Sequence, residues 1–528
     1  MFLQKIPFRA TQSFTEFFLK YIEQDPTLKS FFSRFPVLTN FKEQQNEKAK
    51  TFSPASRQLL LRVLQRQYSN LPQLSTSVKG NIEALTKENC FTVTTGHQLS
   101  IFTGPLYFIY KIVTVINACN QLKKQNPDSH YVPVFWMASE DHDYEEIRSF
   151  RLYGKKYTWE TQQQGAVGRF HTKDFEKLLK QLPGDVGLFR DAYLKNGSLA
   201  EAVRVYVNDL FKEDGLVIID ADDRELKEIL RPVMRVDLFL NTPNALVSDT
   251  NKRLEELGFH PQVNPREINF FYLDKNLRSR LERQGDAFRV VDTDFRFSKA
   301  ELDKIIEDTP ERISPNVILR PLYQELILPN LAYVGGPAEL VYWLELKSMF
   351  EHFSVPFPML LPRNFALIVE APLARKLSNT SLEVSDFFED KNSLFKKWVI
   401  KNSNHDLSLA KAVKEAETVF DEIQKQCSAI DSTLSPMVLA QAARTKQAME
   451  VIEKKMIRAE KRLQSDKLRQ IEAVKDGLFP NGGLQERTDN FLNFFQQDPG
   501  FISELRSHFD PFDFQFNVLS YHDQTRAT

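Results

Sequence analysis

The chain has 528 residues, of which 42% are hydrophobic and 26% charged, a balance typical of globular proteins that excludes wholesale disorder. With 69 Lys and Arg against 70 Asp and Glu, the formal net charge is −1, which argues against a protein built mainly to bind nucleic acid or an anionic membrane. The three cysteines form no CxxC pair, and no segment approaches the ~20 apolar residues that span a bilayer. We therefore expect a cytoplasmic protein with reduced thiols and no membrane partner.

Residues 1–90 have a polar, helical pattern, and a strand, a helix and a second strand follow them. Residues 90–96 (CFTVTTG) form a short β-branched run, Gly104-Pro105 opens a long apolar-periodic segment, and residues 131–139 (YVPVFWMAS) form a second apolar run. A strand, a helix and a strand within about fifty residues match the size of one βαβ unit.

The same alternation returns later in the chain. Buried strands are predicted at 214–223, 330–336 and 356–363, with a helix between the last two. Strands that alternate with helices predict an α/β fold with a mostly parallel sheet covered on both faces. The stretches at about 150–210 and 224–315 are more mixed and read as insertions between strands of one sheet.

Beyond residue 405, apolar residues recur at alternating spacings of three and four, in two series separated by the break DSTLSP. Such a 3.5-residue repeat keeps one apolar seam facing a partner helix, so it predicts an antiparallel helical hairpin. The pattern leaves open whether the seam closes within one chain or between two. The first series is Val413, Ala416, Phe420, Ile423, Cys427, Ile430 and Leu434, and the second is Ala442, Thr445, Met449, Ile452, Met456, Ala459 and Leu463.

Three groups of polar residues follow predicted strands, where open parallel sheets bind their ligands. The first group lies in the loop after residues 90–96, just before a helix with Pro at its first position. Free backbone N–H groups at that helix start favour an anion such as phosphate or carboxylate. An ordinary capped turn explains the same residues. The members of this group are Gly96, His97, Gln98, Thr103 and Gly104.

The second group is Glu140, Asp141, His142 and Asp143, directly after residues 131–139. Crowded carboxylates can raise the pKa of one of them and create a base, or they can bind a divalent metal. Successive residues point in different directions, so these four cannot converge on one metal, and we predict no metal site. The alternative is that the acids cap the next helix.

The third group surrounds the second predicted Gly turn. Gly335-Gly336 allows a tight turn from strand to helix, and two arginines in the group suit bidentate contact with carboxylate or phosphate. A structural salt bridge is the alternative for each arginine. The members of this group are Arg320, Gln324, Tyr333, Gly335, Gly336, Glu339 and Arg363.

Four segments resemble one known family, the bacillithiol-biosynthesis cysteine-adding enzymes, BshC. They are TVTTGHQLSIFTGPLYFIYK (92–111), PVFWMASEDHDYEEI (133–147), LRPLYQELILPNLAYVGGPAELVYWLEL (319–346) and PNGGLQER (480–487). The resemblance implies a Rossmann-like core with connecting insertions, a coiled-coil domain and a homodimer, with a plan similar to class I aminoacyl-tRNA synthetases. It also implies a reaction, in which cysteine is joined to the amine of glucosaminyl malate in the last step of bacillithiol biosynthesis.

On this resemblance the chain divides into three parts. Residues 1–375 form the Rossmann-like core, with N-terminal helices and the two insertions; residues 376–480 form the coiled-coil hairpin; and residues 481–528 pack back on the protein. His97 departs from the Gln that many relatives carry after the glycine. The HIGH and KMSKS signatures of class I synthetases are absent, which leaves the cofactor unknown, with ATP or another nucleotide as the alternatives.

The predicted enzyme is a ligase with cysteine and glucosaminyl malate as substrates. An acid in the second group would bind the amine and act as base, while the turns of the other groups hold phosphate or malate carboxylates. The catalytic candidates are Asp141, Asp143, His142 and His97. The substrate-binding candidates are Gly96, Gln98, Thr103, Gly104, Glu140, Arg320, Gln324, Tyr333, Gly335, Gly336, Glu339 and Arg363.

Two other classes of function are compatible with parts of the sequence. Between residues 438 and 475 there are ten Lys and Arg against five Asp and Glu, so the helical arm of a synthetase-like protein could grip nucleic acid. Surface lysines are routine on long hairpins, and we predict no nucleic-acid partner. In the other alternative, the coiled coil is an assembly scaffold with a degenerate enzyme core, but a scaffold has no need of the polar groups at the strand ends.

Overall fold

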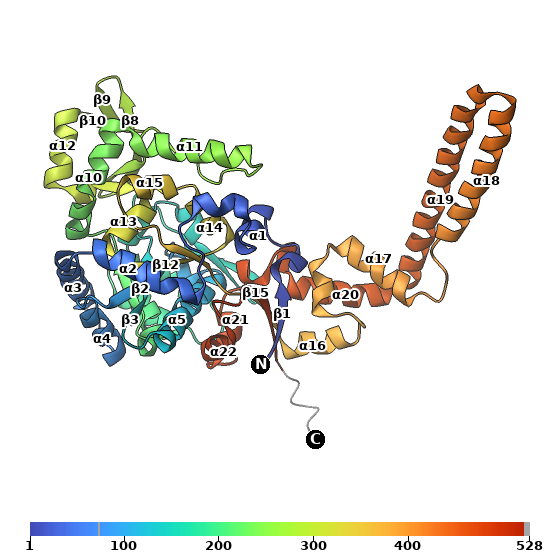
Figure 1. Ribbon diagram of the computed structural model, residues 1–528. Coiled ribbons are helices and arrows are strands. Elements are labelled where there is room, and N and C mark those ends of the chain that lie inside the picture. Colours follow the sequence, from blue (N-terminus) through green and yellow to red (C-terminus); the bar gives the residue numbers. More distant parts are fainter. Residues whose placement is uncertain (72–73, 522–528) are drawn as a thin grey trace.

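The structure is a computed structural model that describes residues 1–71 and 74–521. At its centre is a five-stranded, all-parallel sheet with the strand order β13-β12-β2-β3-β6 (Figure 1). The strands are β2 (Cys90–His97), β3 (His130–Met137), β6 (Val217–Asp220), β12 (Asn330–Gly335) and β13 (Met359–Pro362). The predicted parallel sheet is confirmed.

The order of these strands reverses once. The chain runs outward from β2 through β3 to β6, then returns to the other side of β2 to form β12 and β13. This is the Rossmann order, and the reversal places a topological switch point between β2 and β12, where such sheets bind ligands. The Rossmann-like fold class is therefore confirmed.

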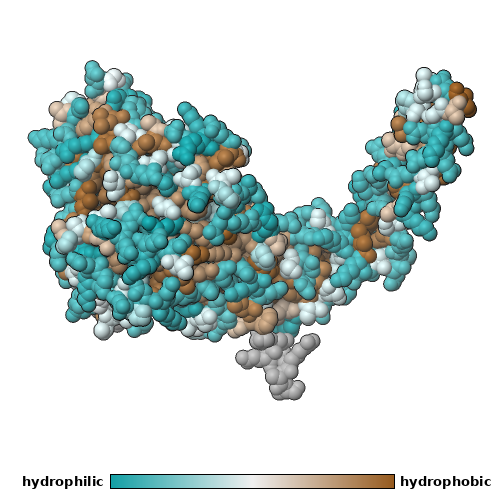
Figure 2. Space-filling view, viewed as in Figure 1, coloured by the Kyte–Doolittle hydropathy of each residue, from teal (hydrophilic) through white to brown (hydrophobic). Residues whose placement is uncertain are grey.

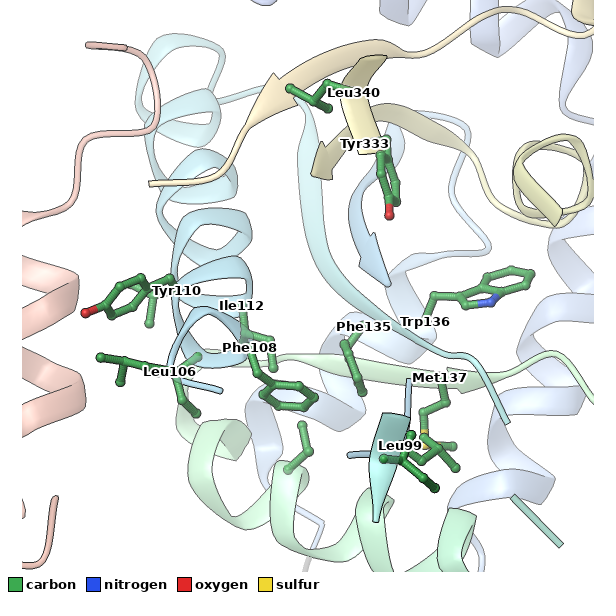
Figure 3. Close-up of a cluster of buried hydrophobic side chains, with 14 of the residues drawn as sticks. Leu99, Leu106, Phe108, Tyr110, Ile112, Phe135, Trp136, Met137, Tyr333 and Leu340 are labelled. Atoms are coloured by element: carbon green, nitrogen blue, oxygen red, sulfur yellow. The ribbon is translucent and has the colours of Figure 1, made fainter. Parts of the chain in front are cut away.

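The sheet is buried on both faces. All eight residues of β2 are buried, as expected for a central parallel strand rich in β-branched residues. Helix α5 (Tyr107–Gln125) packs against β2 and β3. Figure 3 shows Phe108 of this helix beside Phe135 of β3, with the ring centroids 5.1 Å apart.

The N-terminal part of the chain is helical except at its start. Residues of β1 (Phe2–Pro7) form a strand, not the helical pattern that the sequence predicts, because they pair with β15 (Gln515–Ser520) from the other end of the chain. Together with β14 (Phe365–Val369) they make a three-stranded sheet. The helices of this part are α1 (Glu16–Ile22), α2 (Phe41–Thr51), α3 (Pro54–Tyr68) and α4 (Thr76–Ala84).

Further elements separate the strands of the central sheet. A hairpin of β4 (Ser149–Leu152) and β5 (Lys155–Thr158) follows β3. A second five-stranded sheet follows β6, in the order β10-β9-β8-β7-β11. Its strands are β7 (Phe270–Asp274), β8 (Leu277–Gln284), β9 (Ala287–Val290), β10 (Arg296–Ser298) and β11 (Ile313–Pro315). The helices of this region are α6 (Tyr144–Ile147), α7 (Phe175–Leu179), α8 (Gly187–Lys195), α9 (Leu199–Phe211), α10 (Arg224–Leu240), α11 (Thr242–Glu256), α12 (Lys299–Asp308), α13 (Leu319–Ile327), α14 (Pro337–Leu344) and α15 (Lys347–His352).

A helical arm projects from the body of the protein (Figure 1). Helices α18 (Ala410–Ile430) and α19 (Ser435–Leu463) pack against one another as an antiparallel hairpin, which confirms the predicted coiled coil. Ser435 and Pro436 begin α19, where Pro needs no backbone hydrogen-bond donor. The arm is joined to the body by α16 (Ala371–Ser378), α17 (Lys391–Asn402) and α20 (Ser465–Leu478). No helix among the described residues is long and apolar enough to cross a membrane.

The segment after α20 returns to the core. The side chain of Gln485 accepts from the backbone N–H of Ile368 at 2.8 Å and donates to its carbonyl at 3.2 Å, so it satisfies β14 as a neighbouring strand would. Glu486 forms a buried bidentate ion pair with Arg363, at 3.0 and 2.5 Å. Helices α21 (Leu492–Phe495) and α22 (Phe501–His508) complete the segment, and residues 522–528 of the predicted part 481–528 lie outside the described residues.

The buried ion pair gives a test of how the C-terminal segment is anchored. Glu486→Gln leaves the charge of Arg363 buried without a partner, so we expect the free energy of unfolding to fall by about 3–5 kcal/mol. Glu417→Gln breaks an exposed pair with Lys446 on the arm and should cost about 0.5 kcal/mol or less. Urea unfolding followed by circular dichroism measures both. Equal, small losses would show that the pair contributes nothing to anchoring.

Candidate functional site

The carboxyl ends of the five parallel strands form one rim of the central sheet. The β2 loop carries the first predicted group, the β3 loop carries the second, and the loops after β12 and β13 carry much of the third. Because His97 is paired with Met137 across β2 and β3, the first two loops start side by side. The three groups therefore share one edge of the sheet.

An ion pair between the buried Lys111 and the partly exposed Glu339 crosses the switch point between β2 and β12. Lys111 of α5 donates to the carbonyl of Gly96 at 2.8 Å and lies 2.6 Å from Glu339 Oε2. The same carboxylate accepts from the hydroxyl of Tyr333 at 2.7 Å and from the backbone N–H of Gly336 at 2.8 Å. Burial by itself raises the pKa of Glu339, but Lys111 and the other donors outweigh it and lower the pKa to about 2. Glu339 is therefore a permanent carboxylate at the switch point.

The Gly-Gly turn has a structural use in this arrangement. A Cβ on Gly335 would lie 2.8 Å from Leu340 Cδ2, so a side chain there would force the Leu340 side chain to move. The N–H of Gly336, predicted to face an anion, donates to the protein's own Glu339. Lys111 was missed in the sequence, although a lone lysine in the apolar segment LYFIYKIVTVINAC was a visible signal.

His97 lies at the end of β2 as a buried, neutral imidazole. Its Nδ1 is 2.8 Å from the carbonyl oxygen of Gln98. Because a carbonyl oxygen can only accept a hydrogen bond, Nδ1 carries the proton and Nε2 keeps its lone pair. Burial, helped by the charge of Lys111, lowers the pKa of His97 to about 4. Next to it, the Gln98 amide donates to Glu146 at 3.1 Å. The imidazole is therefore neutral at pH 7, with a lone pair on Nε2 that can accept a hydrogen bond.

Arg320 of α13 is a cation with neutral neighbours. Its guanidinium donates to Gln324 Oε1 at 3.2 Å and to the hydroxyl of Tyr342 at 3.3 Å. Three aromatic rings surround it, those of Trp136, Tyr333 and Trp343. Within the described residues no carboxylate forms an ion pair with Arg320, whereas Arg363 is paired with Glu486. Of the two predicted arginines, Arg320 is thus the one available to an anionic group.

The acidic loop after β3 is fixed by charges from the insertion that follows β6. Glu140, whose side chain is 13% exposed, forms an ion pair with Lys227 of α10, and desolvation raises its pKa although Lys227 opposes this shift. Asp141 lies 3.7 Å from Arg278 of β8, and the same guanidinium donates to His142 Nδ1 at 2.7 Å. Burial alone would raise the pKa of Asp141, but His142, Arg278 and the neighbouring backbone N–H groups lower it. Asp141 is therefore ionised at neutral pH.

Asp143 has a different environment from Asp141. Its Oδ1 accepts from the backbone N–H of Glu146 at 3.1 Å, so the side chain caps the start of α6. This is the capping alternative that the sequence left open for the second group.

Two further acids at the end of β6 were not predicted. Asp220 accepts from the hydroxyl of Ser139, and Asp222 forms a bidentate pair with Arg169 at 2.8 Å. The signal was present, because the strand predicted at 214–223 ends in acids. In the part of the chain that the structure describes, no three His, Cys, Asp or Glu side chains are grouped so as to hold a metal.

Comparison with known proteins identifies the family. The model of the N-terminal Rossmann-like domain of bacillithiol biosynthesis BshC matches residues 1–364, and that of its C-terminal coiled-coil domain matches residues 366–521. The chain belongs to the BshC family. Relatives from Flavobacterium johnsoniae and Cytophaga hutchinsonii are 39% and 38% identical, each over 98% of this chain and 99% of the relative. One from Salinibacter ruber is 32% identical over 86% of this chain and 87% of its own, and all three are named "Putative cysteine ligase BshC".

A large cavity opens beside the acidic loop of this BshC-family protein. It has a volume of about 1260 Å³ and is bounded by the insertion after β3 and the turn between β7 and β8. Arg169, the partner of Asp222, lies in its wall. The cavity therefore adjoins the rim on the side of β6.

The low pKa of His97 predicts how stability depends on pH. In the unfolded chain the imidazole takes up a proton near its ordinary pKa of 6.5, but in the folded chain only near 4, so folding favours the neutral form. This contribution of His97 to the free energy of unfolding is fully present at pH 7. It is lost as the pH falls from 6.5 to 4, and the loss is about 3 kcal/mol at most. We expect wild type to lose about that much more than His97→Gln between pH 7 and pH 4 in urea unfolding. Parallel losses in the two proteins would contradict the burial argument.

Proposed function

We propose that this protein joins the carboxyl group of cysteine to the amine of glucosaminyl malate in the last step of bacillithiol biosynthesis. Membership of the BshC family and relatives named for cysteine ligation support a ligase. The observation that carries the proposal is the set of three side chains on one rim. They are a neutral imidazole, His97, an ionised carboxylate, Asp141, and a cation with neutral partners, Arg320.

The reaction demands two separate tasks. An ammonium group and a carboxylate do not form an amide spontaneously in water, so one carboxyl oxygen of cysteine must leave on an activating phosphate or adenylate. The amine must lose a proton before it attacks the activated carbon, and the new C–N bond forms as the C–O bond breaks. The protein therefore needs a base for the amine and a cation for the negative charge that develops on the leaving oxygen.

The rim supplies both. Asp141 is ionised and partly exposed, so its carboxylate can form an ion pair with the ammonium form of the substrate amine. His97 Nε2 is an acceptor at neutral pH and can take the proton that the nitrogen releases as the C–N bond forms, when that nitrogen is far more acidic than a free ammonium group. Arg320 can hold the leaving group or a malate carboxylate, because among the described residues its hydrogen bonds go to neutral groups and the charge of Glu339 acts on it without a direct ion pair.

Asp141 and Asp143 form a matched pair for testing this assignment. Asp141→Asn removes the charge that binds the amine, so we expect kcat/KM for cysteine-dependent thiol formation to fall by about 100-fold or more. Asp143→Asn should stay within about twofold of wild type, because Asn caps a helix as well as Asp does. The assay uses glucosaminyl malate, cysteine and ATP. Near-normal rates in both variants would remove Asp141 from the mechanism.

We also propose that the protein is a homodimer held by its arm. Figure 2 shows apolar side chains along the arm, and Ile430 and Leu463 are 83% and 73% exposed. Val451 and Ile452 are exposed neighbours on α19. A second arm would cover such residues in a two-fold contact, which is the commonest symmetry of soluble oligomers.

Charged substitutions on the arm test the dimer. Val451→Glu combined with Ile452→Glu places charges in the apolar contact, so sedimentation should change from the mass of two chains to that of one. Gln447→Glu adds a negative charge at an exposed polar position of the same helix and should leave the dimer intact. A wild-type protein that sediments as one chain would overturn the proposal.

A further inference from the structure

A smaller cavity lies where three distant parts of the chain meet. Its volume is about 250 Å³, and we call it the basic pocket. The loop before α5, the β4–β5 hairpin and the segment after α20 each form one wall. The lining residues are Gly104, Pro105, Ser149, Phe150, Arg151, Lys156, Asn481, Arg487 and Thr488.

The charge of the basic pocket is one-sided. Arg151, Lys156 and Arg487 line it, and its lining includes no Asp or Glu. Among the described residues no carboxylate forms an ion pair with any of these three, and the one hydrogen bond of Arg151 goes to the carbonyl of Gly154 at 3.1 Å. Three cations around a small cavity repel one another, and a bound anion would remove that repulsion.

Asp489 is the acid whose charge interacts with Arg151 from outside the pocket. Burial raises the pKa of this carboxyl to about 6, with the charge of Glu370 adding to the rise and that of Arg151 opposing it. Asp489 is still mostly ionised at pH 7, but among the described residues it forms no ion pair with Arg151, so no carboxylate contacts that guanidinium directly.

The walls of the pocket are preformed. Gly104 has φ +63°, and a Cβ there would lie 2.6 Å from Ser100 Cβ, so glycine is required at this wall. Asn490 donates to the carbonyls of Phe102 and Gly104 at 2.8 and 2.6 Å, which ties the loop to the C-terminal segment. The 19-residue helix α5 begins just beyond, and the positive end of its dipole adds to the field of the cations.

The pocket is adjacent to the switch point. Tyr107, at the start of α5, lies against His97 with 5.3 Å between ring centroids. The Tyr107 hydroxyl also feels the charges of both Glu339 and Arg487. Tyr107, two residues beyond Pro105 of the pocket wall, thus contacts the imidazole of the rim.

We propose that the basic pocket binds a small polyanion through Arg151, Lys156 and Arg487. The chemistry that these residues recognise is two or more negative charges on oxygen, as in the phosphates of a nucleotide or the carboxylates of a malyl group. A role in presenting that anion to the rim rests on the proposed ligase function, whereas anion binding itself does not.

The experiment is titration calorimetry on the full-length protein, with inorganic pyrophosphate, ATP and malate as separate probes. We expect at least one probe to bind with a Kd below about 1 mM, and binding to weaken as salt is raised. Binding of pyrophosphate and ATP without malate identifies a phosphate site, and binding of malate alone identifies a dicarboxylate site. No detectable binding of any probe at about 10 mM would overturn the proposal.

Variants decide whether binding takes place in this pocket. Lys156→Gln and Arg487→Gln should each weaken the probe by about tenfold, and Arg487→Lys should restore most of the loss. The control is Lys155→Gln, the neighbouring residue on the hairpin, whose amino group lies over the ring of Tyr157 and which is absent from the pocket wall. It should change affinity by less than about twofold. An equal loss in the control would show adventitious binding to surface cations and would overturn the assignment.

The outcomes for the pocket and for the ligase can be told apart. The titrations contain no cysteine and no turnover, so inactive ligase assays leave the binding result unaffected. Thiol formation without anion binding would overturn the proposed anion site and leave the proposed ligase function intact. Thermal melting of each variant confirms that it is folded, and Lys156 lies on an exposed hairpin where truncation should not affect the core.

Discussion

The ion pair between Lys111 and Glu339 is the interaction on which the rim depends. It joins the helix after β2 to the helix after β12; the Lys111 side chain is buried, and that of Glu339 is 28% exposed. Two buried charges cost several kcal/mol of desolvation each unless hydrogen bonds compensate them. Here Gly96, Tyr333 and Gly336 supply those bonds. The same lysine helps to hold His97 neutral, so the structural pair also sets the chemistry of its neighbour.

The C-terminal segment packs against the elements that carry this rim. Gln485 satisfies the edge of β14, Glu486 neutralises Arg363, and Asn490 holds the loop that precedes α5. The segment follows the helical arm in the chain and packs on the core. The charge of Arg363 is neutralised by Glu486, so this arginine has a structural role. Arg320 differs, because its guanidinium hydrogen-bonds to Gln324 and not to a carboxylate.

The sequence predicted the parts of the site that local patterns control. Strand ends followed by polar residues were correctly located for β2, β3 and β12, because a buried strand and its following turn are encoded in adjacent residues. It could not separate Asp141 from Asp143, since that difference comes from Arg278, over a hundred residues away, and from the start of α6. Lys111 was overlooked because its partner lies on another helix.

By itself, then, the sequence determined the α/β class, the parallel sheet, the coiled-coil hairpin and the family. Each of these rests on periodicity or motif spacing within one stretch of chain. The tertiary structure decided the strand order and hence the switch point, the pairing of β1 with β15, and the partner of every buried charge. Those outcomes depend on desolvation and on contacts between residues far apart in the chain, which no local pattern records.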